Sequence, residues 1–131
     1  MEDTKSILIV GTYDTKSDEL LYLEERIRSQ GADVVTMDVS VLGEAKVTTK
    51  ISKFEVANAV GSTIQQVIES GDENSAMQIM AAGAALITSK LYAEGRIDGL
   101  IAMGGTMGTD LALDCARALP LGVPKHVIST V

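Results

Sequence analysis

The run SILIVG at residues 6–11 decides how this chain can fold. Its aliphatic side chains follow one another without interruption and end in a glycine, which is typical of a strand buried on both faces of a parallel sheet. Three later runs of similar character, at 32–41, 97–103 and 125–131, predict three further strands. We therefore expect a parallel sheet of about four strands.

Segments with helical periodicity lie between these runs. Over 17–30, apolar side chains recur at helical spacing between charged ones, which predicts an amphipathic helix. Thr15 and Asp18 have the spacing of a capping box at its start, and Gly31 is a suitable stop at its end. The stretch 43–53, rich in Thr, Ser and Lys, predicts an irregular connection.

Further helical segments are expected in the second half of the chain. They are a segment from about residue 54 to 70, capped by Ser52 and interrupted at Gly61, a long helix over 74–94, and a last helix over 109–119. Strands that alternate with helices imply right-handed crossovers, so we predict an α/β fold of three α/β/α layers around a doubly wound, Rossmann-like parallel sheet. A chain of 131 residues corresponds to a single domain over 1–131, and its last strand favours a fragment of a longer multidomain protein.

The composition excludes several classes of protein. Hydrophobic residues make up 46% of the chain and aromatic residues 3%, so an aliphatic core is expected and a disordered tail is excluded. A net charge of −7 repels a nucleic-acid backbone, so nucleic acid is not an expected partner. The longest uncharged interior stretch, 74–89, is too short and too polar to span a membrane. The polar start is unlike a secretory signal, and we expect a cytoplasmic protein.

Two loops have the composition of a ligand site. In an open parallel sheet, ligands bind beyond the carboxyl ends of the strands where the strand order reverses. An order 2-1-3-4 brings the ends of the first and third strands to that point. The candidate residues are Gly11, Thr12, Tyr13, Asp14, Thr15 and Lys16 in the first loop, and Gly104, Gly105, Thr106, Met107, Gly108 and Thr109 in the second.

The second loop, GGTMGT, favours a phosphate. Its glycines allow the backbone to approach a ligand closely, and Thr106 and Thr109 add hydroxyl donors. The helix that follows offers the positive end of its dipole to an anion. The alternative is a tight strand-to-helix turn in which the glycines are needed only because side chains would clash.

The first loop resembles a Walker A loop without being one, because the glycine before the lysine is missing and Lys16 comes one residue early. Lys16 could reach a phosphate as a point charge, and Asp14 could hold a magnesium ion through water. The alternative is that Asp14 and its neighbours only cap the helix. Asp38 has the position of an acid that binds a ribose hydroxyl in dinucleotide-binding folds, although an acid in a turn after a strand is also common.

Other reactive side chains indicate no catalytic or metal site. His126 has no Cys or His partner at metal-ligand spacing, and Cys115 sits among apolar helix residues, as an inert thiol would. The helix over 74–94 is apolar nearly all round. It is therefore either a central core helix or a contact with a second subunit or a further domain.

Three motifs in order resemble a known family. They are IVGTYDTK at 9–16, GRIDG at 95–99 leading to GGTMGT at 104–109, and ALPLGVPK at 118–125 leading to STV at 129–131. Together they resemble the N-terminal part of the ATP-binding domain family named for the tomato mosaic virus resistance protein, an uncharacterised family of bacteria and plants. The resemblance implies an α/β domain that binds ATP at the two loops, a further C-terminal domain in the full-length protein, and a homo-oligomer. The second loop of the family commonly reads GGSGGT, so Thr106 keeps the hydroxyl whereas Met107 adds bulk.

Taken together, the sequence predicts a nucleotide-binding module that takes ATP, with or without Mg²⁺. Two alternatives stay open. One is an enzyme that acts on a small phosphorylated or carboxylated metabolite with Asp14 as acid or base, and the other is an oligomerisation module. No reaction is assigned, because the sequence shows no nucleophile beside a general base.

Overall fold

The computed structural model describes residues 4–129, without the side chains of 106–108. Within these residues four parallel strands form one sheet in the order β2-β1-β3-β4, which is the order that brings the two candidate loops together. They are β1 (Ser6–Gly11), β2 (Asp33–Asp38), β3 (Gly99–Gly104) and β4 (Lys125–Ser129). The connections that leave β1 and β3 run in opposite directions, so the switch point of the sheet lies between these two strands.

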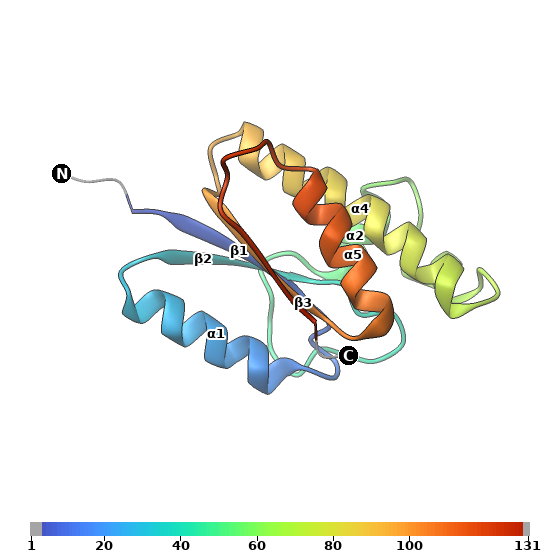
Figure 1. Ribbon diagram of the computed structural model, residues 1–131. Helices are drawn as coiled ribbons and strands as arrows, with labels where there is room; N and C mark the ends of the chain where they lie inside the picture. The colour runs from blue at the N-terminus through green and yellow to red at the C-terminus, as the bar shows by residue number, and fades with distance from the viewer. Residues whose placement is uncertain (1–3, 130–131) are drawn as a thin grey trace.

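Helices cover both faces of the sheet. Within the described residues they are α1 (Ser17–Ser29), α2 (Lys53–Asn58), α3 (Ile64–Ile68), α4 (Glu73–Ala93) and α5 (Thr106–Arg117). Figure 1 shows α1 by itself on one face and α2, α4 and α5 on the other, which confirms the α/β/α layers. The core is divided accordingly into a small cluster around Leu20 of α1 and a larger one around Met80 of α4.

Glycine residues end α1 and α4, as the sequence predicts for α1. Gly31 and Gly95 have φ values of 91° and 72°, which glycine adopts without steric cost. After α1, the Gly31 amide donates to the Arg28 carbonyl and the Ala32 amide donates to the Ile27 carbonyl. This pair of bonds is a Schellman motif, which satisfies carbonyls at the end of the helix.

The predicted capping box at α1 is wrong. This helix begins after Lys16, and no side chain accepts a hydrogen bond from its first amides. Instead of capping the helix, the hydroxyl of Thr15 lies 3.3 Å from that of Thr12. By contrast, Ser52 caps α2 through a capping box with Glu55, at the start that the sequence predicts.

Helices α4 and α5 begin earlier than predicted. Asp72 caps α4 and accepts a 2.6 Å hydrogen bond from the Ser75 amide, so this helix begins one residue before position 74. Helix α5 begins at Thr106 rather than at 109, because Gly105 is its N-cap and the Thr109 hydroxyl donates to the Gly105 carbonyl at 2.6 Å. Much of the predicted GGTMGT loop is therefore the first turn of a helix.

Helix α4 is a central core helix. Its Gly83 lies so close to α2 that a Cβ atom there would come within 2.1 Å of the Val56 carbonyl oxygen. Ala81 and Ala84 are buried beside it. The small residues of α4 thus serve packing inside the fold. Leu86 is 53% exposed on the outer side, and self-association stays a prediction.

No helix that lies within residues 4–129 is both long and apolar enough to cross a membrane. The 21 residues of α4 carry Glu73 and Lys90 near the two ends. Its apolar side chains pack into the larger core cluster. The cytoplasmic location stays a prediction.

Cys115 is expected to resist thiol reagents in the folded protein. It is fully buried on α5, and burial raises the pKa of its thiol to about 12. At pH 8 only on the order of one thiol in ten thousand is then a thiolate, the reactive form. We expect a disulfide reagent to label the folded chain very slowly and to label one thiol at once in denaturant. Rapid labelling without denaturant would show that α5 separates readily from the core.

Candidate functional site

The two candidate loops begin at neighbouring strands. Val10 of β1 pairs in register with Ala102 of β3, so the chain leaves both strands at the same edge of the sheet. From this edge α1 and α5 start on opposite faces (Figure 1). This is the placement at which doubly wound sheets bind ligands.

Gly11 is explained by packing. A Cβ atom at this position would lie 2.6 Å from Cδ1 of Leu20, which is far closer than real Cβ atoms approach another carbon. The absence of a side chain lets α1 lie directly on β1. Packing alone therefore accounts for this glycine, without a ligand.

Asp38 holds the first loop in place. Its carboxylate is 3% exposed, and Oδ1 accepts hydrogen bonds from the Tyr13 amide at 3.2 Å, the Ser40 amide at 2.9 Å and the Ser40 hydroxyl at 2.5 Å. Ser40 Oγ in turn accepts from the Asp14 amide at 3.1 Å. The contact of Asp38 with a ribose stays a prediction, and the burial of this carboxylate speaks against it.

Ser40 is a residue that the sequence analysis missed. A usable signal was present in part, because an aspartate after a strand often accepts a hydrogen bond from the backbone amide two residues later. The amide of Ser40 closes that turn on Asp38. Its hydroxyl then links the turn after β2 to the loop after β1.

The ring of Tyr13 belongs to the core and not to the ligand site. It is 1% exposed, in the cluster under α1 with Leu20 and Met103. Its hydroxyl finds no hydrogen-bond partner among the described residues. Burial raises the pKa of this hydroxyl, and the negative charges of Glu24 and Asp38 raise it further. The Tyr13 amide donates to Asp38 and its carbonyl accepts from the Ser17 hydroxyl, so this residue serves the fold.

The remaining side chains of the first loop are accessible. Thr12, Asp14 and Lys16 are half-buried and Thr15 is exposed. The Asp14 carboxylate lies against Gly43, where a Cβ atom would come within 2.6 Å of Asp14 Oδ2. Thr12, Asp14 and Thr15 form one wall of a cavity, and Lys16 lies outside it.

In the second loop, the hydroxyl of Thr109 is used inside the fold. Thr109 donates to the Gly105 carbonyl and lies 3.0 Å from Ser129 Oγ of β4. Its hydroxyl is thus engaged, contrary to the expectation of a free donor. The side chains of Thr106, Met107 and Gly108 lie outside the described residues. Gly105 offers no side chain to the first amides of α5.

A cavity of about 470 Å³ adjoins the first loop. Its volume is within the range of small-molecule sites. It is formed by the loop after β1, the segment after β2 and the start of α4, and its lining is mostly aliphatic. The residues are Thr12, Asp14, Thr15, Val39, Val41, Leu42, Ile68, Gly71, Asp72, Glu73, Ala76 and Met77.

Lys53 holds the segment after β2, which contributes Val41 and Leu42 to the cavity lining. Its side chain is 5% exposed, and Nζ donates to the Gly43 carbonyl at 2.8 Å and lies 3.4 Å from Glu44 Oε1. The irregular segment after β2 is thereby fastened to the start of α2. The sequence analysis did not single out Lys53, because nothing in its spacing distinguishes a buried lysine from a solvated one.

The charged groups of the cavity are acidic. Asp14, Asp72 and Glu73 line it, and none of the described lining residues is basic. The hydrogen bond from the Ser75 amide lowers the pKa of Asp72, so this carboxyl is ionised at neutral pH. Within residues 4–129, no group of three His, Cys, Asp or Glu side chains is arranged to hold a metal ion. The cavity thus suits an uncharged part of a ligand better than a phosphate.

Comparison with known protein families identifies the family of this chain. Residues 5–131 match the model of the Uncharacterised protein family (UPF0261) N-terminal domain. The chain belongs to this family. The N-terminal position of the matched domain agrees with the part of the family that the three motifs resemble.

Relatives of this UPF0261 domain occur in bacteria and in tomato. A UPF0261 protein of Brucella suis is 52% identical over 125 residues, which cover 95% of this chain and 30% of the relative. A UPF0261 protein of Clostridium tetani is 41% identical, over 97% of this chain and 31% of the relative. The ToMV susceptible protein tm-1 of Solanum lycopersicum is 30% identical, over 95% of this chain and 19% of that protein. The UPF0261 domain thus spans less than a third of these relatives.

A solved structure shares the fold. The C-terminal domain of a hydrogenase from Pyrococcus furiosus superposes with a TM-score of 0.60 at 18% identity, and the match covers 97% of this chain and 92% of that one. At this identity the likeness concerns the fold alone. It supports the α/β architecture of the UPF0261 domain and carries no function to it.

Proposed function

We propose that this UPF0261 domain binds ATP at the carboxyl edge of its sheet, with the phosphates at the starts of α1 and α5. The observation that carries the proposal is that both helices begin at residues without an acceptor side chain, Lys16 and Gly105. The first amides of a helix require acceptors from elsewhere. An anion between the two helix starts would supply them and would be favoured by both dipoles.

The other helices of the described chain differ in this respect. Ser52 and Thr63 cap α2 and α3, and Asp72 caps α4. The two starts without a side-chain cap are those that follow the strands of the switch point. Lys16 adds a positive charge at one of them, and Mg²⁺ bound to the nucleotide would reduce the repulsion between ATP and a chain of charge −7.

The cavity explains why a nucleotide is favoured over inorganic phosphate. Thr12 and Thr15 belong both to the first loop and to the cavity lining. A ligand with its phosphates near Lys16 can therefore extend its other end into the cavity. The aliphatic lining suits the faces of a base, and the carboxylates of Asp14 and Asp72 suit its amino group or the sugar hydroxyls.

Titration calorimetry with ATP, with and without Mg²⁺, tests this proposal. We expect saturable binding at one site, weaker binding of adenosine, and weaker binding of inorganic phosphate, because each of these probes fills only part of the site. Adenosine should compete with ATP. The absence of binding to both this chain and the full-length Brucella suis relative would contradict the proposal.

A substitution at the start of α5 tests whether a phosphate binds there. Gly105→Asp gives α5 a side-chain cap and places a negative charge where we propose a phosphate. We expect ATP binding to weaken by about tenfold or more, since the introduced charge repels the anion, while the melting temperature is kept or raised. Gly105→Ala is the matched control, because it adds a Cβ atom without an acceptor. Equal ATP affinity of the Asp and Ala variants would place the phosphates elsewhere.

A further inference from the structure

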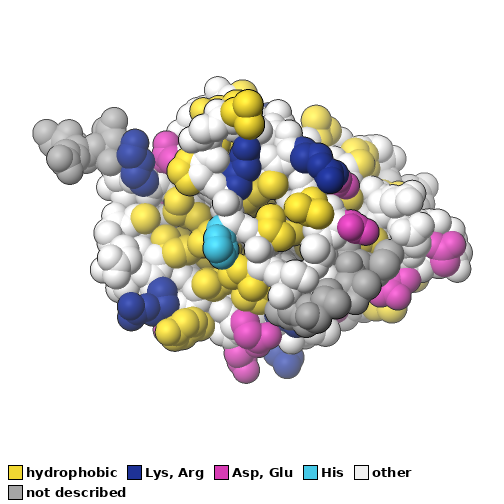
Figure 2. Space-filling view, in the orientation of Figure 1, with side chains coloured by type: hydrophobic (Ala, Val, Ile, Leu, Met, Phe, Trp, Pro, Cys, Tyr) yellow, Lys and Arg dark blue, Asp and Glu magenta, His cyan; other side chains and the backbone are white. Residues whose placement is uncertain are grey.

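One face of the sheet is only half covered. Helix α1 packs on β1 and β2. No described helix lies over β3 and β4 on this side, whereas α5 covers both strands on the other side (Figure 1). Figure 2 shows hydrophobic side chains gathered around His126 of β4. This uncovered part of the sheet is hereafter the open face.

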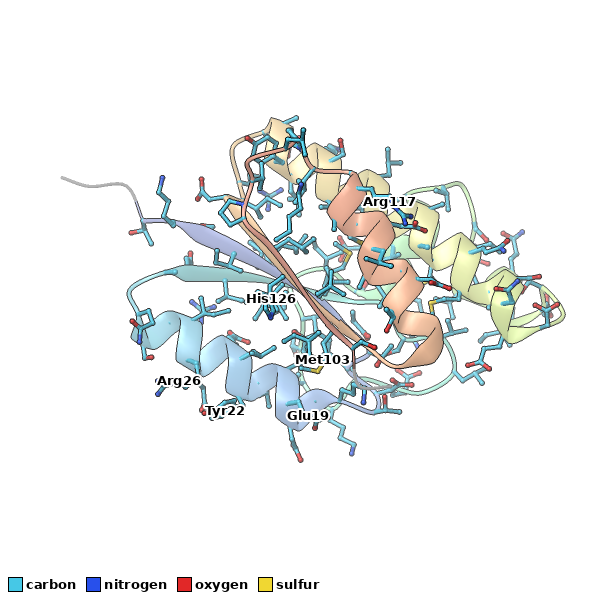
Figure 3. All side chains as sticks on the ribbon, viewed as in Figure 1. Glu19, Tyr22, Arg26, Met103, Arg117 and His126 are labelled. Atoms are coloured by element: carbon cyan, nitrogen blue, oxygen red, sulfur yellow. The ribbon has the colours of Figure 1, made fainter. Side chains whose placement is uncertain are left out.

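The strand register identifies the side chains of the open face. Ile101 of β3 pairs with His126, and Met103 pairs with Ile128. Ile101 also pairs with Ile9 of β1, which packs in the cluster under α1. Side chains in register point to the same side of a sheet. Figure 3 shows Met103 and His126 on the side of the sheet that faces α1.

The open face is apolar but incompletely buried. Ile101 and Ile128 are partly exposed, and His126 is exposed. On the opposite side of β3, Leu100 and Ala102 are buried in the larger core cluster. Both faces of a parallel sheet are normally covered, because its strands carry apolar side chains on each side.

The outer edge of β4 is also unpaired within residues 4–129, since β4 pairs with β3 alone. An unpaired edge exposes backbone amides and carbonyls to other chains. The open face and this edge adjoin each other. Whatever covers one is therefore in a position to cover the other.

We propose that the polypeptide that follows the matched region in full-length UPF0261 proteins covers the open face, as a helix packed beside α1. The matched model is an N-terminal domain, and the match covers only 30% of the Brucella suis relative, so a long segment follows it there. Helices are the elements that cover parallel sheets.

The open face also defines the chemistry of the covering helix. Its apolar stripe contacts Ile101 and Ile128, which are partly exposed, whereas Met103 is already buried in the cluster under α1. It carries one polar side chain opposite His126, because a buried imidazole requires a hydrogen-bond partner. A strand from the same segment that pairs with β4 would remove the free edge.

Hydrogen exchange tests the proposal, with β1 as an internal reference because it is paired on both sides. In the 131-residue chain, we expect the amides of β4 to exchange about a hundredfold faster than those of β1. In the full-length Brucella suis relative, the segment aligned with β4 should exchange within about tenfold of that aligned with β1. The same ratio in both proteins would overturn the proposal.

A charge on the open face gives a second test. We expect His126→Glu to leave the melting temperature of the 131-residue chain unchanged and to lower that of the full-length relative by several degrees when glutamate is placed at the aligned position. Gln78→Glu, which adds one negative charge on the exposed side of α4, is the matched control and should change neither protein. A 131-residue chain that forms dimers which His126→Glu dissociates would overturn the proposal, because a second copy would then cover the open face.

Discussion

The Gly83→Ala variant is expected to lose at least about 2 kcal/mol of its free energy of unfolding. The added Cβ atom would lie 2.1 Å from the carbonyl oxygen of Val56. This oxygen belongs to the backbone of α2, so it cannot rotate aside as a side chain does. Either α2 must move away from α4 or α4 must bend, and both open the larger core cluster.

The sign of this effect distinguishes packing from helix propensity. In an exposed helix, replacing glycine with alanine stabilises by about 1 kcal/mol. Ala82→Gly, at the exposed neighbouring position of α4, is the control and should destabilise by about that amount. Chemical denaturation followed by circular dichroism measures both. A Gly83→Ala variant as stable as the parent chain would mean that α2 does not rest on α4.

The Asp38→Ala variant is expected to lose about 2–4 kcal/mol and to loosen the first loop. Three donors, two amides and a hydroxyl, lose their common acceptor, and they are buried where water cannot replace it easily. Limited proteolysis should then cut the chain within 12–16 at protease concentrations that leave the parent chain intact. Binding of ATP should weaken in parallel if the loop contributes to the site.

Two variants show whether Asp38 acts through these bonds. Asp38→Asn keeps one carbonyl oxygen, which can still accept from the amides of Tyr13 and Ser40, so it should lose less stability than Asp38→Ala. Ser40→Ala removes only the hydroxyl that joins Asp38 to the Asp14 amide, and it should have an intermediate effect on proteolysis. Full stability of Asp38→Ala would contradict this account of the loop.

The strands and the layers could be predicted because they depend on local patterns. Apolar runs such as SILIVG have few alternatives to a buried strand, and the crossover rule then restricts how the strands are connected. Helix starts were harder, because several neighbouring residues can act as caps. At α4 the sequence offers Asp72, Asn74 and Ser75, and only the packed structure selects Asp72.

The candidate site could be predicted in position but not in composition. The reversal of strand order is sufficient to place both loops at one edge of the sheet. The cavity, however, joins Thr12, Val41 and Met77, which lie far apart in the sequence and share no motif. The burial of Tyr13 and Asp38 was missed for a similar reason, since a polar residue in a loop is typical of an exposed site until its partners are known.

Gly11 and Gly105 each belong to a strand-to-helix motif in the sequence, but the two positions differ in their tolerance of a side chain. A side chain at position 11 would press on Leu20 and lift α1 from the sheet. Position 105 begins a helix, and its φ of −82° lies outside the left-handed region that favours glycine. Libraries that probe the proposed ATP site should therefore vary position 105 and keep position 11 as glycine.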